Sequence, residues 1–277
     1  MMKLENPIEH SLSDNNILNP NYWDQRRKSY ITRKIDPKNY NLFGVPFVDR
    51  LKPYLKPDIT KRVLEIGCVP CEYLCALAKE FKYQVYGIDF TTKIHLAADF
   101  LKANGIKNFK LFNEDFLSWR TDERFDIILS LGFIEHFIDY ESVIEKHIEL
   151  LADSGYLVLG LPNFRYGQFF MRCLIDKEHI RRHIMDCMNL KKIRSILEEK
   201  GMTVHELDYI GGTFNIGTIG FDKQIKRNIF QKVLLKITEG IAWRTESILK
   251  KGNINIPNRY FSPYIFSISQ KKIFSSN

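Results

Sequence analysis

Polar and small residues that suit a nucleoside ligand follow four apolar runs between residues 62 and 131. Gly67 comes after the first run, Asp89 after the second, Asp115 after the third, and Ser130 ends the fourth. An aspartate in the position of Asp89 can accept hydrogen bonds from both hydroxyls of a ribose. Asp115 can accept a hydrogen bond from the exocyclic amine of an adenine, and a glycine allows a tight turn beside the ligand. The order of these residues predicts a site for an adenosine compound.

The elements that position these residues are short apolar runs alternating with amphipathic segments. Continuous runs such as Ile127 to Leu129 are typical of parallel strands that are buried on both faces. The alternation predicts an α/β fold with a Rossmann-like seven-stranded sheet flanked by helices, and such sheets bind ligands at the carboxyl ends of their strands. Strands are expected at 63–66, 85–89, 109–112, 125–130, 155–161, 203–209 and 264–269, and helices at 47–55, 71–81, 92–104, 140–151 and 190–200.

The composition is that of an ordinary globular protein, with 277 residues of which 44% are hydrophobic and 27% charged. It excludes a disordered chain, a collagen-like repeat and a coiled coil. No run is long enough for a transmembrane helix, and residues 1–13 lack the apolar stretch of a secretory signal, so we expect a cytoplasmic protein. The net charge of +8 indicates an anionic partner, and nucleic acid, a membrane surface and a phosphorylated small molecule all fit.

The chain divides into four expected segments. The first sixty residues are polar and aromatic with several prolines, and we expect helices there, one of them opening at Tyr22, and no strand. A basic stretch separates the last two expected strands. The segments are a helical cap at 1–60, a core at 61–221, a basic amphipathic helical insertion at 222–256, and the last strand with the C-terminus at 257–277.

Residues 62–161 resemble the class I S-adenosylmethionine-dependent methyltransferases. The resemblance rests on four motifs, which read Val-Leu-Glu-Ile-Gly-Cys from residue 63, Tyr-Gly-Ile-Asp from 86, Asn-Glu-Asp-Phe from 113 and Phe-Asp-Ile-Ile-Leu-Ser from 125. It implies the fold of that class and S-adenosylmethionine as the cofactor, with S-adenosylhomocysteine as its product. The chain is most similar to enzymes that methylate small molecules or surface polysaccharides. The resemblance places these residues at the cofactor: Glu65, Gly67, Cys68, Asp89, Phe90, Asp115, Phe116, Ser130 and Leu131, with Tyr22 on a lid helix.

One residue departs from the pattern of the resembled family. The first loop, residues 67–71, reads Gly-Cys-Val-Pro-Cys, where some branches carry Gly-Cys-x-Pro-Gly. We expect the sulfur of Cys71 to lie where the methionine part of the cofactor passes. The alternative function is therefore a catalytically weak or inactive binding protein of the same fold. Cys68, Cys71 and Cys75 could hold a metal or a cluster, but small buried side chains are the simpler interpretation, and we assign no metal ligand.

His136 is the residue that we expect to act in catalysis. It follows the fourth strand, near the place where the methyl group should point, and an imidazole titrates near neutral pH. It could serve as the base for an oxygen or nitrogen acceptor, or it could only order the loop. The transfer would be a direct in-line displacement, for which the protein supplies proximity and orientation.

The acceptor is expected to bind between the fifth and sixth strands. In the resembled family this region recognises the acceptor, and we assign that role to Asn163, Arg165 and Tyr166. The arginines and histidines of residues 163–189 suit an anionic small molecule, such as a phosphorylated, nucleotide-linked or lipid-linked sugar. A solvated basic face is the alternative. Nucleic acid is not favoured, because no Asn/Asp-Pro-Pro-Tyr/Phe sequence follows the fourth strand.

A basic amphipathic helix is expected within residues 223–251. This stretch carries eight Lys or Arg against two Glu, a balance of 8 − 2 = +6. Packing over the acceptor site, homodimerisation and contact with an anionic membrane surface are its three candidate uses. Packing on the protein's own core is the commonest of them. The apolar stripe recurs at every fourth residue: Ile225, Ile229, Val233, Ile237 and Ile241.

Overall fold

A seven-stranded sheet forms the centre of the computed structural model, which describes residues 34–42, 45–212, 219, 226–252 and 256–273. The strands follow the spatial order β5-β4-β3-β6-β7-β9-β8, and within the described chain all of them are parallel except β9. The expected α/β fold with seven strands is confirmed. The bounds are β3 Arg62–Ile66, β4 Gln84–Ile88, β5 Phe109–Phe112, β6 Phe125–Leu131, β7 Leu151–Pro162, β8 Met202–Ile210 and β9 Tyr264–Lys271.

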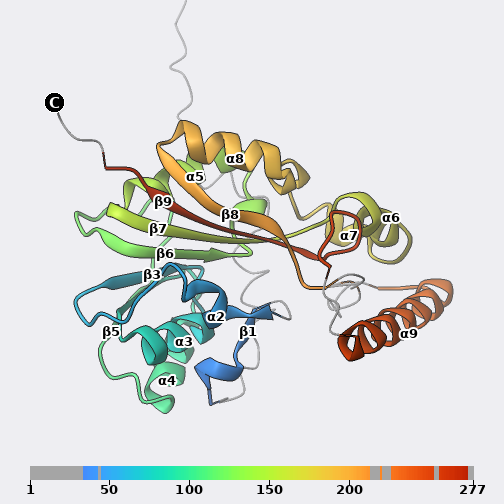
Figure 1. The fold of residues 1–277 in the computed structure, drawn as a ribbon, viewed down its shortest axis with the longest axis horizontal. Coiled ribbons are helices and arrows are strands. Elements are labelled where there is room, and N and C mark those ends of the chain that lie inside the picture. The colour runs from blue at the N-terminus through green and yellow to red at the C-terminus, as the bar shows by residue number, and fades with distance from the viewer. Residues whose placement is uncertain (1–33, 43–44, 213–218, 220–225, 253–255, 274–277) are drawn as a thin grey trace, which may run out of the picture.

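Helices cover both faces of the sheet (Figure 1). The apolar stripes of α3 (Glu72–Phe81) and α4 (Ile94–Ala103) pack on one face, and those of α5 (Tyr140–Glu149) and α8 (Leu190–Glu199) pack on the other. These four helices lie where the apolar periodicity predicts them, with ends that differ by one or two residues. The helix expected at 47–55 is shorter, because α2 ends at Leu51.

β9 runs antiparallel to the other six strands. The alternation of strands and helices in the sequence predicts parallel strands and gave no sign of this reversal. β8 ends at Ile210, which pairs with Tyr264 at the start of β9. Between them the chain stays at this edge of the sheet in α9 (Ile229–Lys251), as Figure 1 shows. β9 therefore starts beside the ends of β7 and β8 and runs back between them, antiparallel to both.

The segment expected to be a helical cap contains a short antiparallel strand pair. β1 (Asn41–Leu42) pairs with β2 (Val45–Pro46), between η2 (Pro37–Asn39) and α2 (Phe47–Leu51). The prediction that no strand occurs before residue 60 is therefore wrong. Strands of two residues are too short to produce the alternation that a sequence pattern needs. The helix expected at Tyr22 lies outside the described residues.

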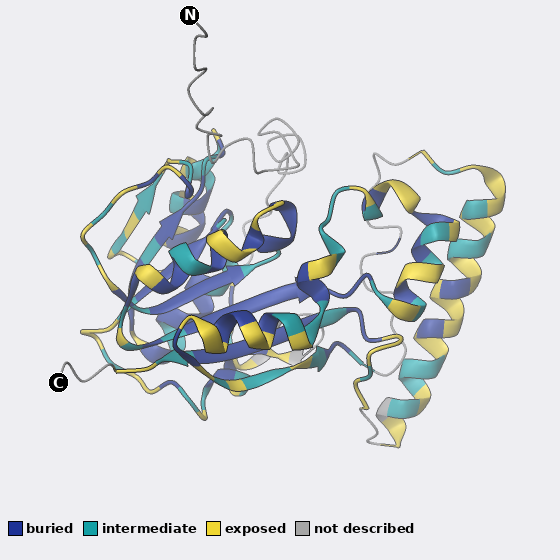
Figure 2. Ribbon diagram, turned by 90° about the horizontal axis from the view of Figure 1, so that it is seen from above, coloured by how far each residue is buried: buried dark blue, intermediate teal, exposed yellow. Residues whose placement is uncertain are grey.

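A helical lobe extends from the edge of the sheet at which β7 and β8 end (Figures 1 and 2). It consists of α6 (Tyr166–Ile175), α7 (Lys177–Ile180) and α9, and α9 packs on α6. η4 (Met185–Met188) follows the lobe in the chain and packs on α8 and the core of the sheet. In the part of the chain that the structure describes, no helix is both long enough and apolar enough to cross a membrane.

One buried carboxylate ties the lobe together. Asp176 accepts a hydrogen bond from Arg227 at 2.8 Å, and its other oxygen lies 3.9 Å from Arg172 and 3.5 Å from His179. Burial alone would raise the pKa of Asp176, but the hydrogen bond from His179 and the charges of both arginines lower it below its usual value. Arg172 is fully buried and lies 3.7 Å from the centre of the Phe164 ring. Arg172 and His179 are therefore structural, although the sequence placed them among the residues facing the acceptor.

Candidate active site

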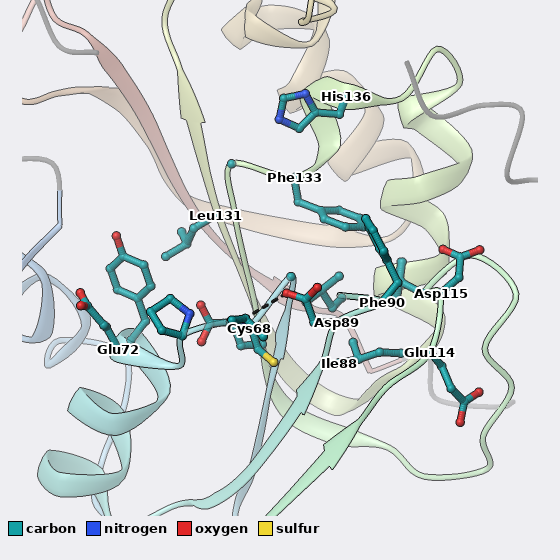
Figure 3. A pocket seen from close by; sticks show the side chains of 18 of the residues that line it. Cys68, Glu72, Ile88, Asp89, Phe90, Glu114, Asp115, Leu131, Phe133 and His136 are labelled. Carbon is teal, nitrogen blue, oxygen red and sulfur yellow. Dashed lines mark hydrogen bonds between the residues drawn. The ribbon is translucent and has the colours of Figure 1, made fainter. Parts of the chain in front are cut away.

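A pocket of about 560 Å³ opens at the carboxyl ends of β3, β4 and β6 (Figure 3). Its volume lies within the range typical of small-molecule sites. The lining residues belong to four segments of the chain, which begin at Glu65, Ile88, Glu114 and Leu131. Each segment follows one strand of the parallel part of the sheet. The pocket therefore lies at the edge where the sequence predicted the ligand.

Asp89 stands at the end of β4 and is held there by backbone groups. Its two carboxylate oxygens accept hydrogen bonds from the amides of Val69 at 3.1 Å and Thr91 at 3.0 Å. The side-chain amide of Asn113 donates to the carbonyls of Asp89 and Thr91, which fixes the turn that follows the strand. Each carboxylate oxygen has more than one lone pair, so a ribose hydroxyl can still donate to it.

Gly67 lies at the turn that leads from β3 into the pocket. Its φ of +73° is in the left-handed region, and an added Cβ would lie 3.3 Å from the ring of Phe133. A side chain at this position would be strained and would narrow the pocket at its wall. The predicted role of Gly67 as a position of close approach fits this geometry.

Aromatic rings form one wall of the pocket beside Asp115. Phe116 is buried, and its ring meets that of Phe133 edge to face at 5.7 Å. Lys146 holds the chain below this wall by donating to the carbonyls of Leu117 at 2.7 Å and Trp119 at 2.8 Å. Burial lowers the pKa of Lys146 to about 8. The wall is apolar with one carboxylate beside it, which suits a flat base with an exocyclic amine.

The structure brings most of the predicted cofactor residues to this one pocket. Ser130 is an exception, because it is buried in β6 and does not line the pocket, while the adjacent Leu131 does. Tyr22 lies outside the described residues. The predicted residues that line the pocket are Glu65, Gly67, Cys68, Asp89, Phe90, Asp115, Phe116, Leu131 and His136.

Cys71 does not lie where the sequence analysis expected it. Its side chain is fully buried, it does not line the pocket, and burial is the main reason that the pKa of its thiol is raised, with Cys68 beside it. Its φ of +72° lies in the left-handed region, which is unfavourable for residues other than glycine. The expectation that its sulfur obstructs the cofactor is therefore not met.

His136 lines the pocket from η3 (Ile134–His136), above Phe133 in Figure 3. Its Nδ1 donates to the carbonyl of Arg182 at 2.9 Å, because a carbonyl can only accept. The carboxylate of Glu135 lies 3.8 Å from its Nε2, and the ring of His183 is centred 4.7 Å from its ring. Burial raises the pKa of Glu135 to about 8.

The three predicted acceptor residues have different positions. Asn163 is fully buried, and its amide donates to the carbonyls of Ser262 at 2.7 Å and Arg259 at 3.1 Å. The structure therefore gives Asn163 a structural role in place of the predicted contact with an acceptor. Arg165 and the exposed Tyr166 begin α6 outside the pocket, and their contact with an acceptor stays a prediction.

Two lining residues in the first turn of α3 were missed by the sequence analysis. The carboxylate of Glu72 accepts a hydrogen bond from the hydroxyl of Tyr40 at 2.8 Å, and Tyr73 packs against Tyr40 and Phe47. Burial raises the pKa of Tyr73. The available signal was their position directly after the glycine turn, since the first turn of that helix faces the same edge as the strand ends.

The lining residues fit S-adenosylmethionine on the features of this structure alone. Asp89 suits the ribose hydroxyls, and Asp115 with the ring of Phe116 suits the adenine. Glu65 is a buried carboxylate in the same pocket, which suits an ammonium group. The left-handed turn at Gly67 leaves space for the ligand beside the backbone.

Solved structures share the fold at low sequence identity. A Bacillus halodurans C-125 protein, solved as a candidate methyltransferase, matches with a TM-score of 0.58 and 18% identity over 81% of this chain and 98% of its own. The YcgJ protein of Bacillus subtilis matches with a TM-score of 0.54 and 16% identity, over 82% of this chain and 98% of its own. Phosphoethanolamine N-methyltransferase 2 of Haemonchus contortus was solved with S-adenosyl-L-methionine. It matches with a TM-score of 0.54 and 18% identity, over 82% of this chain and 51% of its own. No curated protein matches the sequence.

A family model described as a methyltransferase domain matches residues 30–207, which is more than half of the chain. The matched range contains β3 to β7, most of β8 and every residue that lines the pocket. This agrees with the fit of the pocket to the cofactor. The chain therefore belongs to the methyltransferase-domain family of S-adenosylmethionine-dependent methyltransferases, and S-adenosylmethionine is its cofactor.

Proposed function

We propose that this methyltransferase acts on a hydroxyl or amine of a small anionic acceptor, such as a glycan or sugar-nucleotide precursor that carries phosphate. When bound, S-adenosylmethionine supplies the activated methyl group. The protein contributes by holding the acceptor in line with that group. The proposal for the acceptor rests on two arginines whose guanidinium groups lie over the ring of one exposed tyrosine at the start of α6.

Arg165 and Arg259 both lie over the ring of Tyr166, with guanidinium carbons 5.4 and 5.5 Å from its centre. Arg259 is exposed, and within the described residues neither guanidinium forms an ion pair with a carboxylate. Guanidinium groups held in place by an aromatic ring suit a phosphate, which they contact through paired hydrogen bonds. Arg165 follows β7 and Arg259 precedes β9, so both lie near the edge of the sheet where the pocket opens.

We propose that His136 takes the proton from the acceptor atom that receives the methyl group. It lines the pocket, and its Nδ1 is fixed on the carbonyl of Arg182, which leaves Nε2 as the nitrogen without a proton in the neutral ring. A nitrogen of this kind can act on the proton of an acceptor hydroxyl. The ring contact with His183 connects His136 to Phe164, at the end of β7 where the lobe begins.

Substituting either arginine tests the acceptor class. Arg165→Ala and Arg259→Ala should each raise KM for a phosphorylated acceptor about 10-fold or more, because a charge-assisted hydrogen bond contributes roughly 1.5–3 kcal/mol. Formation of S-adenosylhomocysteine with a panel of sugar nucleotides and sugar phosphates measures this. Affinity for the cofactor, measured by calorimetry, should not change.

Arg181→Ala is the matched control, since Arg181 is exposed and forms an ion pair with Glu178 at 2.8 Å. Turnover of neutral acceptors only, with phosphorylated ones inert, would show that the acceptor class is wrong. A folded protein that binds neither S-adenosylmethionine nor S-adenosylhomocysteine would instead support the inactive binding protein.

A lipid-linked acceptor is a second candidate, and the exposed face of α9 favours it. The apolar stripe expected to pack on the core faces outward, with Ile229, Val233, Ile237 and Ile241 between 49% and 79% exposed. The buried side of the helix carries Thr238 and Ala242. Packing of the stripe on the protein's own core is therefore wrong for the described residues.

Basic side chains accompany this apolar face. Lys232, Lys236 and Arg244 are exposed on α9, and Trp243 is 74% exposed. Exposed apolar and aromatic side chains flanked by cations are typical of a helix that lies in the interface of an anionic membrane. An anionic membrane surface is the partner that we propose for α9.

A further inference from the structure

Glu135, His136 and His183 bring three potential metal-ligating atoms to one point beside the pocket. One atom from each side chain lies within 4.8 Å of the other two. Glu135 and His136 belong to η3, after β6, whereas His183 lies between α7 and η4. This is the one such group of three among the residues that the structure describes.

Both imidazole rings are oriented as metal ligands usually are. Nδ1 of His136 donates to the carbonyl of Arg182 at 2.9 Å, and Nδ1 of His183 donates to the carbonyl of His179 at 2.7 Å. The proton is therefore on Nδ1 in each neutral ring, and the lone pair is on Nε2. A metal-ligating histidine commonly has its second nitrogen fixed on a backbone carbonyl in this way.

The carboxylate of Glu135 is an independent observation that points to a cation. The side chain is 2% exposed, and among the described residues its Oε2 has no hydrogen-bond partner. No lysine or arginine of the described chain forms an ion pair with it. A buried carboxylate is costly unless a cation accompanies it, and neutral imidazoles do not supply one.

The two segments are tied together before any ligand binds. The amide of Ile184 donates to the carbonyl of Glu135 at 2.7 Å, beside the bond between His136 and Arg182. Nε2 of His136 lies 3.8 Å from Oε1 of Glu135. Ligand atoms on a tetrahedral zinc lie roughly 3.4 Å apart when each bond is about 2.1 Å, so small side-chain rotations bring this pair to ligand spacing.

We propose that Glu135, His136 and His183 bind a divalent cation of the zinc type at the acceptor side of the pocket. Two imidazoles and a carboxylate are a donor set that zinc accepts while keeping a position open. His136 lines the pocket, so a cation held by these three residues would lie beside the space that the acceptor enters. Through the cation, rather than as a free base, His136 would then act on the acceptor.

The use of this cation, though not its binding, rests on the methyl transfer proposed above. A cation beside an acceptor hydroxyl lowers the pKa of that hydroxyl. The hydroxyl proton passes to water, the oxygen–carbon bond forms as the sulfur–carbon bond breaks, and the electron pair of the broken bond remains on sulfur. The acceptor atom would therefore be an oxygen.

Metal titration of the full chain tests the site. Protein freed of metal with a chelator should bind one equivalent of Zn²⁺ or Co²⁺, measured by calorimetry and by elemental analysis after gel filtration. Co²⁺ should give visible absorption bands of a nitrogen- and oxygen-ligated site. Glu135→Gln and His183→Gln should each weaken binding by at least about 100-fold, because each changes one of three ligands and the loss of a group that only supports a ligand already costs roughly 10- to 100-fold.

His205→Gln is the control, since His205 is exposed on β8 and bonds to Gln270. Equal metal affinity in the wild type and in folded Glu135→Gln and His183→Gln variants would overturn the site, as would absence of binding to the wild type. Affinity for S-adenosylhomocysteine is measured on the same samples. Cofactor binding without metal binding rejects the cation alone, and metal binding without cofactor binding rejects the methyl transfer.

Discussion

The cofactor site depends on a few side chains whose positions the backbone fixes. Asp89 is 4% exposed and held by two amides, so its carboxylate is oriented before the cofactor arrives. Cys71, four residues beyond Gly67, is buried behind the same loop and does not line the pocket. Within this one loop, Gly67 lines the cofactor pocket whereas Cys71 packs in the core behind it.

Asp89→Ala should weaken binding of S-adenosylhomocysteine by about 100-fold or more, because two hydrogen bonds to a charged group are lost. Cys71→Gly should leave the affinity within about twofold, since the sulfur does not line the pocket. Calorimetry on the reduced proteins measures both, with circular dichroism as the check on folding. Similar losses for the two variants would contradict the assignment of the pocket.

At the element scale, local signals explain which helices were predicted well. Asp139 caps α5 by accepting from the amide of Ser142 at 3.1 Å, and Asn189 caps α8 by accepting from that of Lys191 at 3.2 Å. Residues of these types directly before an apolar period indicate a helix start. The helices of the lobe carry a buried Arg172 and Asp176 instead, which interrupt the apolar pattern.

α5 also carries a buried histidine that makes stability depend on pH. His147 is fully buried, donates from Nδ1 to the carbonyl of Val143 at 2.6 Å and contacts the pocket wall through Phe116. Burial lowers its pKa to about 4 in the folded protein, against 6.5 as the usual value. Below 6.5 the unfolded chain binds a proton that the folded chain does not, so stability falls as the pH drops towards 4.

The contribution of His147 between pH 7 and pH 5 is about 2 kcal/mol, from a slope of roughly 1.4 kcal/mol per pH unit below 6.5. Urea unfolding measures the free energy of unfolding at pH 7 and at pH 5. From pH 7 to pH 5 this free energy should fall by about 2 kcal/mol less in His147→Leu than in the wild type. Equal pH dependence in the two proteins would mean that His147 does not stay neutral when folded. His205→Leu, at an exposed position, serves as the comparison.

In the molecule as a whole, α9 forms the outer side of the lobe and carries many exposed residues (Figure 2), among them the apolar residues Ile229, Val233, Ile237 and Ile241. The full chain should sediment with vesicles that contain anionic lipid and much less with neutral vesicles, because cations and apolar side chains act together. Ile237→Asp should abolish this binding, and Lys236→Glu should weaken it and reduce its salt dependence. Thr203→Asp, exposed on β8, is the control.

Binding to neither kind of vesicle, together with a dimer in sedimentation equilibrium that Ile237→Asp dissociates, would assign the stripe to a second copy of the chain. A monomer that binds no vesicle would leave both proposed partners wrong. Affinity for the cofactor reports that each variant remains folded, since α9 does not contribute to the pocket lining.

The seven strands, most of the helices that cover them and most strand-end residues of the cofactor site could be predicted from local sequence patterns. These follow from local patterns, because a buried parallel strand reads as an apolar run and its carboxyl end falls next to it in the chain. Asp89 and Asp115 were found in this way. The membership in a methyltransferase family follows from the same motifs.

The direction in which individual side chains point could not be predicted from the sequence, because it depends on contacts between distant segments. His136 meets the carbonyl of Arg182, which is 46 residues away, and no local pattern encodes that contact. The side to which the stripe of α9 turns depends on what else covers the core, so periodicity alone could not assign it. The direction of Cys71 depends on the left-handed backbone at that residue. Contacts between distant segments, rather than local preference, set these features.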